Sequence, residues 1–477
     1  MPDSDQYESS EQDASGLASG KSVTRRQFLK IAAIAGASVG VGGGLLAACG
    51  GSGTPTSTSA EAPTTTTTSV ETSTSVTSAP TAGREIKIGF VSPQTGPLAF
   101  FGVPDKYCLA RWNEFAAGGL VCGDNQKHPI SIVMVDSQSD TNRAAQVASD
   151  LINNDKVDLL MVASAGDTVN PVSEQAEAYG MPCLCGDNPA EGFFAGRKVP
   201  ADGFKWSYLA FWSNASQADV VVGMWSQVAT NKVVGALWPN DLDGAGYRVA
   251  FPPVLQAQGY SVVDAGEFQD GTEDFTSIIQ KFKAAGVEIL AGTMITPDFD
   301  NFYKQAKQQG LNPKIAAIGK ATTFPEGAAS LGSLGTNMAT SIIWSSAYPY
   351  KSSLTGETCA QLAADYEAKI GSQYSPAILH YALFEWAVDV LKRTTSIGPQ
   401  TIIDAVKTTK LDTIDGTFDF QQPVDPKGNR PWINDCLTPN VAGQWVKGTG
   451  KWPFDLVICD VGKWTDVPVQ GKLLPLP

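Results

Sequence analysis

The sequence predicts an α/β protein in which two lobes of parallel sheet, flanked by helices, follow a long N-terminal segment of different composition. Two observations support this prediction. From residue 84 onward, short β-branched runs alternate with helical runs, and the alternation occurs as two successive series. The part of the 477-residue chain that follows the N-terminal segment is also long enough for about two domains.

Residues 1–48 are predicted to be an export signal. Arg25 and Arg26 form a cationic start, and glycines dilute the apolar run at 28–46, which makes it a poor membrane-spanning helix. A charged start, an apolar middle and small residues before a cleavage point are typical of a signal that is removed. The stretch TRRQFLK resembles the twin-arginine export motif, and LAAC resembles the lipobox of bacterial lipoproteins. This resemblance implies cleavage before Cys49 and lipid on its sulfur, with a permanent membrane anchor as the alternative.

Residues 49–83 are expected to form a lipidated cysteine followed by a disordered tether. The segment is rich in Ser and Thr and has almost no large apolar side chain, so burial cannot offset the entropy lost on ordering. A glycosylated stalk is compatible with the same composition. We therefore expect an extracytoplasmic protein that uses the twin-arginine route and contacts the cell membrane only through lipid at Cys49.

The composition of the whole chain excludes several kinds of partner. A net charge of −14 and a pI near 4.7 argue against nucleic acid, because phosphates require basic surfaces. His128 and His380 are the only histidines, which leaves little material for a histidine metal site or a Ser-His-Asp triad. We expect His128 in a loop and His380 in a helix, at the core or its boundary. We predict no metal ion and no cofactor.

The first series of elements begins with a buried strand at 86–92, which is predicted by the continuous β-branched run IKIGFVS. The helix that follows ends at paired glycines. The remaining elements are strands at 130–136, 157–163 and 181–185, separated by helices at 142–153 and 171–180.

The second series has the same alternation. In the helix predicted at 274–286, the apolar residues recur at helical spacing and mark a face toward the core (Phe275, Ile278, Ile279 and Phe282). The other elements are helices at 215–229, 245–259 and 298–310, and strands at 233–238, 260–266 and 288–294. Helices between about 355 and 409 and a β-rich tail complete the chain.

The cysteines suggest two candidate disulfides. If Cys49 carries lipid, seven of the eight cysteines remain, and an odd number leaves at least one unpaired. Cys108 and Cys122 bracket the end of a helix, and Cys436 and Cys459 lie on two β-like runs that KGTGKWP separates as in a hairpin. The stretch CLC has no second cysteine pair or histidine nearby, so structural thiols are expected there instead of a metal site.

Phosphate-binding motifs are weak in this chain. Gly319-Lys320 lacks the upstream glycine of a phosphate-binding loop, and no GxGxxG follows a strand in the required context. The stretch DGAG at 243–246 opens a helix and either binds an anion weakly or forms a simple glycine turn.

Four stretches carry a family resemblance. IKIGFVSPQTGPLAFFG, NDLDGAG, GEFQDGTEDFTSIIQKFKAAGVEIL and FYKQAKQQGL resemble the type I periplasmic binding proteins of ABC transporters, especially the branched-chain amino-acid-binding group. The resemblance covers nearly all of residues 84–460. It implies two Rossmann-like lobes with a ligand cleft between them, closed by hinge bending. The chain would cross near residues 207, 344 and 415, so that lobe 1 comprises 84–207 and 345–414, and lobe 2 comprises 208–344 and 415–477.

The resemblance also implies ligand contacts. In the family, an acid after a proline in the second lobe meets the ligand's ammonium group, and TPDF places Asp298 there, with a helix-start aspartate as the alternative. The anion pocket of the first lobe uses hydroxyls and N–H groups at a helix start. Here SAGDTVNP provides Ser164 and Thr168, with Gly166 in place of the usual serine.

Several departures from the family pattern count against a simple aliphatic amino acid as the ligand. Asp167 and Asp187 add negative charge, and Asp243 stands where many relatives carry an aromatic residue. Aromatic side chains in the same loops belong either to the core or to the site (Phe100, Phe101, Trp212, Trp238 and Trp344). Acids that alternate with aromatics suit a ligand with an amine or amide and an apolar body.

The predicted site lies at the carboxyl ends of strands, where open α/β sheets bind ligands. It consists of Thr95, Gly96, Phe100, Phe101, Ser164, Gly166, Thr168 and Asp187 on one lobe and Trp238, Asp243 and Asp298 on the other. The predicted protein is a monomeric, lipid-anchored solute-binding protein that delivers a small amino acid, amide or related amine or carboxylate to an ABC import permease. A ligand-sensing ectodomain of the same fold is the alternative. An enzyme is not predicted, because no nucleophile is paired with a base.

Overall fold

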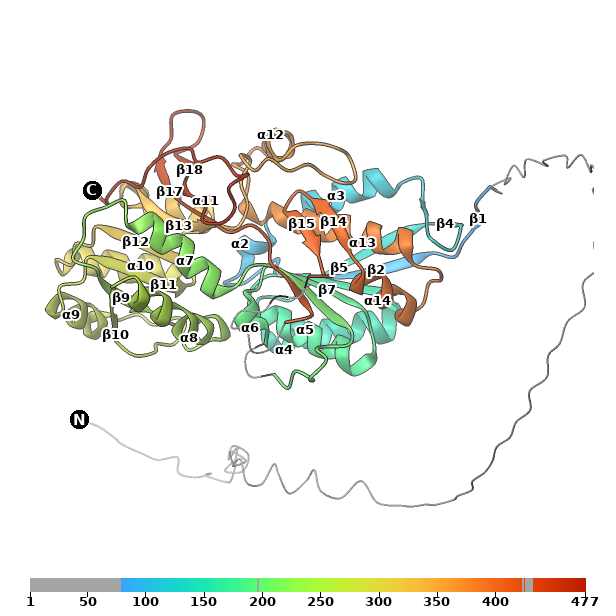
Figure 1. Cartoon of the computed structure of the whole chain (residues 1–477), viewed down its shortest axis with the longest axis horizontal. Helices are drawn as coiled ribbons and strands as arrows, with labels where there is room; N and C mark the ends of the chain where they lie inside the picture. The colour runs from blue at the N-terminus through green and yellow to red at the C-terminus, as the bar shows by residue number, and fades with distance from the viewer. Residues whose placement is uncertain (1–78, 195–196, 423, 425–431) are drawn as a thin grey trace, which may run out of the picture. The chain divides into compact units, whose positions relative to one another are not determined.

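A computed structural model describes residues 79–194, 197–422, 424 and 432–477 (Figure 1). The predicted signal, Cys49 and most of the predicted tether lie outside the described residues. Thr81 and Ala82, which we assigned to the tether, form strand β1 (Thr81–Ala82) and pair in parallel with β4 (Gln126–His128). Strand β1 therefore consists of two residues that the prediction assigned to the tether, and His128 lies on a strand instead of in a loop. In the described part of the chain, no helix combines the length and apolar character needed to cross a membrane.

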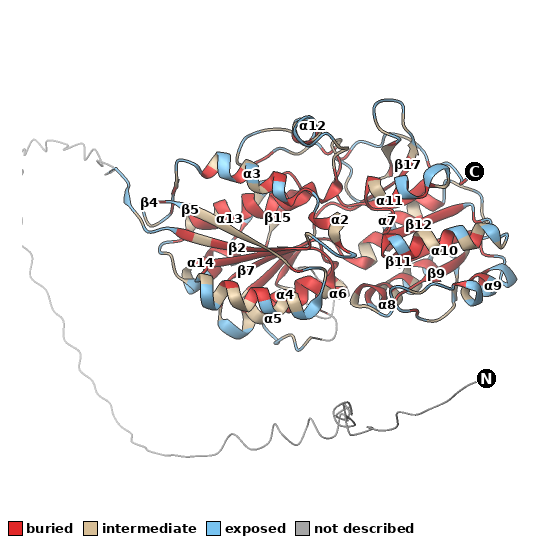
Figure 2. Cartoon of the chain, turned by 180° about the vertical axis from the view of Figure 1, so that it is seen from behind, coloured by how far each residue is buried: buried red, intermediate tan, exposed pale blue. Residues whose placement is uncertain are grey.

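The first sheet has six parallel strands in the order β16–β8–β7–β6–β2–β5. The β-branched runs that predicted strands form its centre, and the central strands are buried (Figure 2). Its strands are β2 (Ile86–Ser92), β5 (Ile130–Asp136), β6 (Leu159–Ala163), β7 (Cys183–Gly186), β8 (Ser207–Ala210) and β16 (Asp435–Cys436).

Helices pack on both faces of this sheet (Figure 1). They are α2 (Ala99–Gly102), α3 (Asp105–Ala116), α4 (Thr141–Asp150), α5 (Gly166–Tyr179), α6 (Ala190–Phe194), α13 (Tyr381–Arg393) and α14 (Pro399–Lys407), with α12 (Cys359–Ile370) further out. A short sheet of β1, β4 and β3 (Leu120–Val121) and a 3₁₀ turn at Pro376–His380 belong to the same lobe.

The second sheet has seven strands in the order β10–β9–β11–β12–β13–β17–β18. Five are parallel: β9 (Val233–Leu237), β10 (Ser261–Asp264), β11 (Ile289–Met294), β12 (Ile315–Lys320) and β13 (Met338–Ile342). The tail adds the antiparallel hairpin of β17 (Val441–Lys447) and β18 (Phe454–Asp460). The helices of this second lobe are α7 (Asn214–Trp225), α8 (Leu242–Ala257), α9 (Thr276–Ala284), α10 (Thr296–Gln308) and α11 (Pro325–Ser330).

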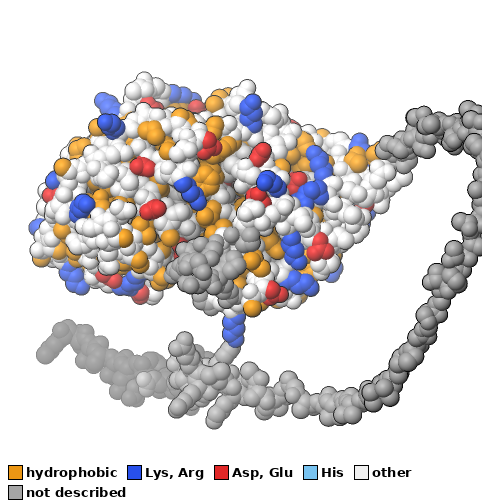
Figure 3. All heavy atoms as spheres, viewed as in Figure 1, with side chains coloured by type: hydrophobic (Ala, Val, Ile, Leu, Met, Phe, Trp, Pro, Cys, Tyr) orange, Lys and Arg blue, Asp and Glu red, His pale blue; other side chains and the backbone are white. Residues whose placement is uncertain are grey.

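The core of the second lobe includes the face predicted from helical spacing. Phe275, Ile279 and Phe282 are fully buried at or within α9. Edge-to-face contacts join the rings of Phe275 and Phe282 to Phe302 on α10. The periodicity of this segment therefore identified its buried side correctly. Over the face of the body seen in Figure 3, acidic and basic side chains are interspersed.

The chain crosses between the lobes three times. Two crossings lie where the sequence places them, between β8 and α7 and just after β13. The third lies between β16 and β17, about twenty residues beyond the predicted position near Asp415. The hairpin of β14 (Lys410–Thr413) and β15 (Gly416–Asp419) stays in lobe 1, because the rings of Phe418 and Phe420 pack against Trp386 at 5.6 and 4.8 Å. β16 then pairs with β8, so the first lobe keeps the chain as far as Cys436.

Neither candidate disulfide is formed. Each of the seven cysteines in the described ranges is a buried free thiol. Cys436 lies on β16 in the first sheet and Cys459 on β18 in the second, because the hairpin that KGTGKWP joins is β17–β18. Cys183 and Cys185 share one face of β7, with their sulfurs 3.6 Å apart.

Candidate ligand-binding site

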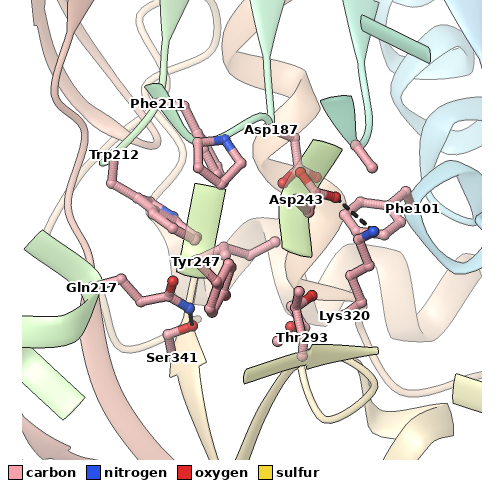
Figure 4. A pocket seen from close by; sticks show the side chains of 15 residues that line it. Phe101, Asp187, Phe211, Trp212, Gln217, Asp243, Tyr247, Thr293, Lys320 and Ser341 are labelled. Atoms are coloured by element: carbon pink, nitrogen blue, oxygen red, sulfur yellow. Dashed lines mark hydrogen bonds and ion pairs between the residues drawn. The ribbon is translucent and has the colours of Figure 1, made fainter. Parts of the chain in front are cut away.

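A small cavity lies between the lobes, at the carboxyl ends of both sheets (Figure 4). Its volume is about 40 Å³. Lobe 1 contributes Phe101, Ala165, Asp187, Pro189, Phe211 and Trp212, and lobe 2 contributes Gln217, Asp243, Tyr247, Thr293, Gly319, Lys320, Thr323, Ser341 and Ile343. Most of these residues directly follow a strand or end one, which is the position that open α/β sheets use for ligands.

The two lobes touch next to this cavity. The ring of Phe101 in lobe 1 packs edge-on against Phe324 in lobe 2, with centroids 4.8 Å apart. At Gly166, a side-chain carbon would lie 3.3 Å from Leu242 Cβ and 3.4 Å from Asp243 Oδ1, both in lobe 2. The absence of a side chain at 166 therefore lets α5 and α8 approach closely, and the lobes are closed over the cavity.

Part of the predicted site is brought together at the cavity. Phe101, Asp187 and Asp243 line it directly. Ser164 and Thr168 lie close by at the start of α5 and are buried, but the Thr168 hydroxyl donates to the Ala165 carbonyl.

Other predicted residues have local structural contacts away from the cavity lining. Thr95 donates its hydroxyl to Asp136 at 2.6 Å, and Gly96 adopts a positive φ of 89° beside the Gln138 carbonyl. Phe100 is half-buried against Phe324. Trp238 is in the lobe 2 core, and Trp344 donates its indole N–H to the Ile414 carbonyl.

Asp298 also lies outside the cavity lining. Asp298 is in the first turn of α10, and its Oδ2 accepts a hydrogen bond of 2.9 Å from the Gly271 amide. Burial raises the pKa of Asp298, and this hydrogen bond opposes the rise. The geometry therefore fits the helix-start interpretation better than the ammonium-binding one.

Lys320 is the principal site residue that sequence reasoning missed. Its ammonium lies 2.7 Å from Asp241 Oδ2 and 2.6 Å from Asp243 Oδ2, and these three residues form what we call the lysine cluster. Burial would lower the pKa of Lys320, but the two carboxylates raise it well above its usual value. The backbone at Lys320 has a φ of 62°, which non-glycine residues rarely adopt. One feature of the sequence could have indicated this role, because Lys320 ends the apolar run IAAIGK, which predicts a strand.

A second buried ionic group reaches the cavity from lobe 1. His380 lies between Asp105 and Asp187, and we call these three residues the histidine cluster. Burial would lower the pKa of His380, but the flanking carboxylates raise it to about 10. His380 was expected at the core, and the structure confirms its burial.

The electrostatic balance of the cleft is acidic. Each cluster has two carboxyl groups for one cation. Burial, with a contribution from Asp243, raises the pKa of Asp167 to about 7, and burial with the nearby Asp241 raises the pKa of Asp270 to about 6. Carboxylates that raise one another's pKa favour either protons or a cationic ligand between them.

Polar atoms in the cavity wall lack partners. Oδ1 of Asp243, Oε1 of Gln217 and Nε1 of Trp212 are buried and make no hydrogen bond within the described structure. Gln217 uses its amide nitrogen to donate to Ser341 at 2.6 Å, which leaves its oxygen as an acceptor. Two acceptors and one donor therefore face a space bordered by aromatic rings, an arrangement that suits a small polar ligand with an apolar part. The described residues contain no group of side chains arranged to hold a metal ion.

Comparison with known proteins identifies the family. The family model described as "Periplasmic binding protein" matches residues 85–433. The chain belongs to the periplasmic binding protein family. This assignment agrees with the two-lobed α/β architecture, and it confirms the predictions of a type I binding-protein fold and of a binding protein instead of an enzyme.

Individual members of the periplasmic binding protein family are distant from this chain in sequence. A leucine-, isoleucine-, valine-, threonine-, and alanine-binding protein of Pseudomonas aeruginosa is 24% identical over 235 residues, which are 49% of this chain. The match spans only 60% of that relative's length.

Solved structures in this family share the fold over nearly their full length. The leucine-binding protein LivK of Thermotoga maritima has a TM-score of 0.63 at 17% identity, covering 78% of this chain and 98% of its own. LivJ of Streptococcus pneumoniae, solved with isoleucine, has a TM-score of 0.62 at 19% identity, covering 78% and 99%. A solute-binding protein of Rhodopseudomonas palustris, solved with 3,4-dihydroxybenzoic acid, has a TM-score of 0.62 at 18% identity. The match covers 80% of this chain and 98% of that protein.

Proposed function

We propose that this protein is a lipid-anchored, extracytoplasmic solute-binding protein that closes its two lobes over a small polar ligand and delivers it to an ABC import permease. The ligand class is an amino acid, an amide or a related amine or carboxylate. The observation that carries this proposal is the cavity between the lobes, whose buried wall has the unpartnered atoms Asp243 Oδ1, Gln217 Oε1 and Trp212 Nε1.

Unpartnered buried polar atoms are costly, at about 1–3 kcal/mol each, and a ligand that pairs with them offsets this cost. The atoms come from both lobes, so a ligand that satisfies all three stabilises the closed arrangement. The names of relatives are consistent with this class, since one is named for binding leucine, isoleucine, valine, threonine and alanine, and another was solved with 3,4-dihydroxybenzoic acid. The lysine cluster and Asp187 make this cavity more highly charged than an aliphatic ligand alone requires.

A ligand screen tests this proposal. The melting temperature is measured with amino acids, their amides, alkylamines and aromatic acids, and a true ligand at a hundredfold excess over its Kd stabilises the protein by about 2.7 kcal/mol. In the matched variant Trp212→Phe, a smaller aromatic ring replaces the indole and the N–H donor is lost, so the shift in melting temperature should decrease. A ligand whose effect is identical in both proteins binds elsewhere.

The lipid anchor is tested separately. We expect Cys49 to be the mature N-terminus, so mass spectrometry of protein extracted from membranes should find a lipidated N-terminal fragment that begins there. In the variant Cys49→Ala, the protein should leave the membrane fraction. Mature protein that retains Met1 and an unmodified Cys49 would contradict the anchor and leave the ligand site untouched.

A further inference from the structure

His380 has a carboxylate at each ring nitrogen. Its Nδ1 is 2.7 Å from Asp105 Oδ1, and its Nε2 is 3.0 Å from Asp187 Oδ2. The side chains of His380 and Asp105 have no exposed surface, and that of Asp187 is 3% exposed. Carboxylate oxygens accept hydrogen bonds, so both ring nitrogens donate, and a histidine that donates from both nitrogens is positively charged. His380 is therefore an imidazolium.

The Asp105 end of the histidine cluster is fixed within lobe 1. Ser92, at the end of β2, donates its hydroxyl to Asp105. Gln94 donates its amide to Ser92 Oγ at 2.6 Å and to the Gly102 carbonyl at 2.9 Å. Each member of this buried chain has a partner, so the chain holds the imidazolium ring in one orientation.

Asp187 is the end of the cluster that reaches the cavity. It follows β7 with a φ of 51°, a left-handed conformation that is rare for a residue with a side chain. Its carboxylate faces Asp243 from lobe 2 (Figure 4). Burial raises the pKa of Asp187, His380 opposes this rise, and Asp243 adds to it. Without the imidazolium, the Asp187 side chain would shift toward the neutral acid.

We propose that His380 is a positioning residue of the ligand site, which holds Asp187 ionised and directed into the cavity so that Asp187 binds a positively charged nitrogen of the ligand. This inference rests on the proposed function and narrows its ligand class to amines. Asp243 pairs with Lys320 through Oδ2 and leaves Oδ1 without a partner, so a ligand cation between Asp187 and Asp243 Oδ1 is attracted by a carboxylate from each lobe. The rings of Phe101, Phe211 and Trp212 offer apolar and cation-binding faces around the same space.

His128 provides a matched control. It is the only other histidine, its side chain is 2% exposed, and its Nε2 lies 3.1 Å from Asp124 Oδ2. It differs in that its Nδ1 meets the Arg84 carbonyl at 2.7 Å, and it lies on β4, away from the residues that line the cavity. Replacing His128 therefore removes a buried histidine–aspartate pair without altering the cavity wall.

Three probes that share the isobutyl group of leucine test which ligand charge Asp187 prefers. Leucine has an amine and a carboxylate, isoamylamine lacks the carboxylate, and 4-methylpentanoate lacks the amine. Calorimetry at pH 7.5 compares them in the wild type, His380→Gln, Asp187→Asn and His128→Gln. We expect the two amines to bind more tightly than 4-methylpentanoate, His380→Gln and Asp187→Asn to weaken amine binding by about tenfold or more, and His128→Gln to change it less than twofold.

Nitrogen-15 NMR of the two histidine side chains gives an independent readout. The other titratable groups that face the histidine cluster are Asp243 on α8, Asp415 in the β14–β15 turn, and Cys108 on α3 and Tyr366 on α12 beside Asp105. We expect the His380 ring to remain doubly protonated at pH 9, to lose this property at lower pH in Asp187→Asn, and to shift when isoamylamine is added. A merely structural histidine would not respond to the amine. The spectrum of His128→Gln assigns the remaining signals to His380.

Several results overturn the proposal. These are a neutral His380 ring at pH 7.5, wild-type amine affinity in folded His380→Gln or Asp187→Asn, and 4-methylpentanoate binding as tightly as isoamylamine. If 4-methylpentanoate alone binds at the cavity, the inference fails and the proposed function stands. If none of the three probes binds, the amine class fails in this skeleton, and the wider ligand screen then decides whether the proposed function fails with it.

Discussion

The two lobes bring similar charges to the cavity on different frameworks. In each, one buried cation lies between two carboxylates: the histidine cluster in lobe 1 and the lysine cluster in lobe 2. The imidazolium is a planar ring whose two nitrogens both have a carboxylate partner, and one of these partners, Asp105, accepts a further hydrogen bond from Ser92. The ammonium of Lys320 is at the end of a flexible chain that starts from a strained backbone position at the cavity edge.

This difference suggests different roles for the two cations. In the histidine cluster, both ring nitrogens of His380 and both carboxylate oxygens of Asp105 have partners, so the cluster keeps Asp187 Oδ2 in place whether or not a ligand is present. In the lysine cluster, Oδ1 of Asp243 has no partner, and the Lys320 stem lines the cavity. The lysine cluster can therefore rearrange around a ligand, while the histidine cluster holds Asp187 in one position.

The largest expected effect comes from removing the lysine. Lys320→Met leaves Asp241 and Asp243 buried without a cation, and breaking a buried pair in this way costs about 3–5 kcal/mol of unfolding free energy. Lys314→Met is the control, because Lys314 pairs with Glu288 at 3.0 Å on the surface and is 45% exposed. Urea unfolding measures both. If the two variants lose the same free energy of unfolding, the buried lysine cluster stabilises the fold no more than a surface ion pair does.

Two aspartates of lobe 2 have different expected roles: Asp243 faces the ligand cavity, and Asp298 lies at the start of a helix. Asp243→Asn removes a charge that faces the ligand, and we expect it to weaken ligand binding by about 2–5 kcal/mol. Asp298→Asn keeps the hydrogen-bond acceptor for the Gly271 amide and should change affinity less than about threefold, which corresponds to roughly 0.6 kcal/mol. Calorimetry with the ligand found by screening decides between them. A larger effect at Asp298 would restore the ammonium-binding role that the sequence suggested.

The histidine cluster should make stability depend on pH. The pKa of His380 is raised from 6.5 to about 10 on folding, so its contribution is complete below about pH 6.5 and is lost as the pH rises through 10. We expect the unfolding free energy to fall by about 4 kcal/mol between pH 6.5 and 10, because a difference of one pKa unit between the folded and unfolded states is worth about 1.4 kcal/mol. His380→Gln should flatten this dependence, and His128→Gln should not. Parallel pH curves in the wild type and His380→Gln would contradict an imidazolium in the folded state.

The cysteines should give the smallest effect. A bond between Cys436 and Cys459 would join a strand of one sheet to a strand of the other, whereas the structure has both as free thiols. We therefore expect dithiothreitol to leave the melting temperature unchanged. A native disulfide typically contributes about 2–4 kcal/mol, so a drop of several degrees would reveal one.

Much of the fold was predictable because each element has a local signature. Continuous β-branched runs identified the central strands, and the spacing of Phe275, Ile279 and Phe282 identified a core face. The third crossing was misplaced because the segment after Asp415 is held in lobe 1 by packing of Phe418 and Phe420 on a distant tryptophan, Trp386. No local pattern reports such a contact.

The site was only partly predictable for a related reason. Asp187 and Asp243 follow strands, and a rule about strand ends places them at the cavity. Lys320 and His380 lie far from their acidic partners in sequence: Lys320 is 79 residues from Asp241, and His380 is 193 residues from Asp187. A lysine at a strand end and a histidine in a helix have ordinary structural explanations until the fold brings them to an acid.

Closure of the two lobes around a ligand is the central claim, and an interlobe distance tests it most directly. Tyr179 on α5 and Val249 on α8 are 50% and 65% exposed, so cysteines at these positions accept spin labels while the seven native thiols of the described chain stay buried. Pulsed electron resonance then reports the distance between the lobes. We predict a broad distribution without ligand that narrows, on adding the ligand found by screening, to the separation of the closed structure. An identical distribution with and without that ligand would contradict capture by lobe closure.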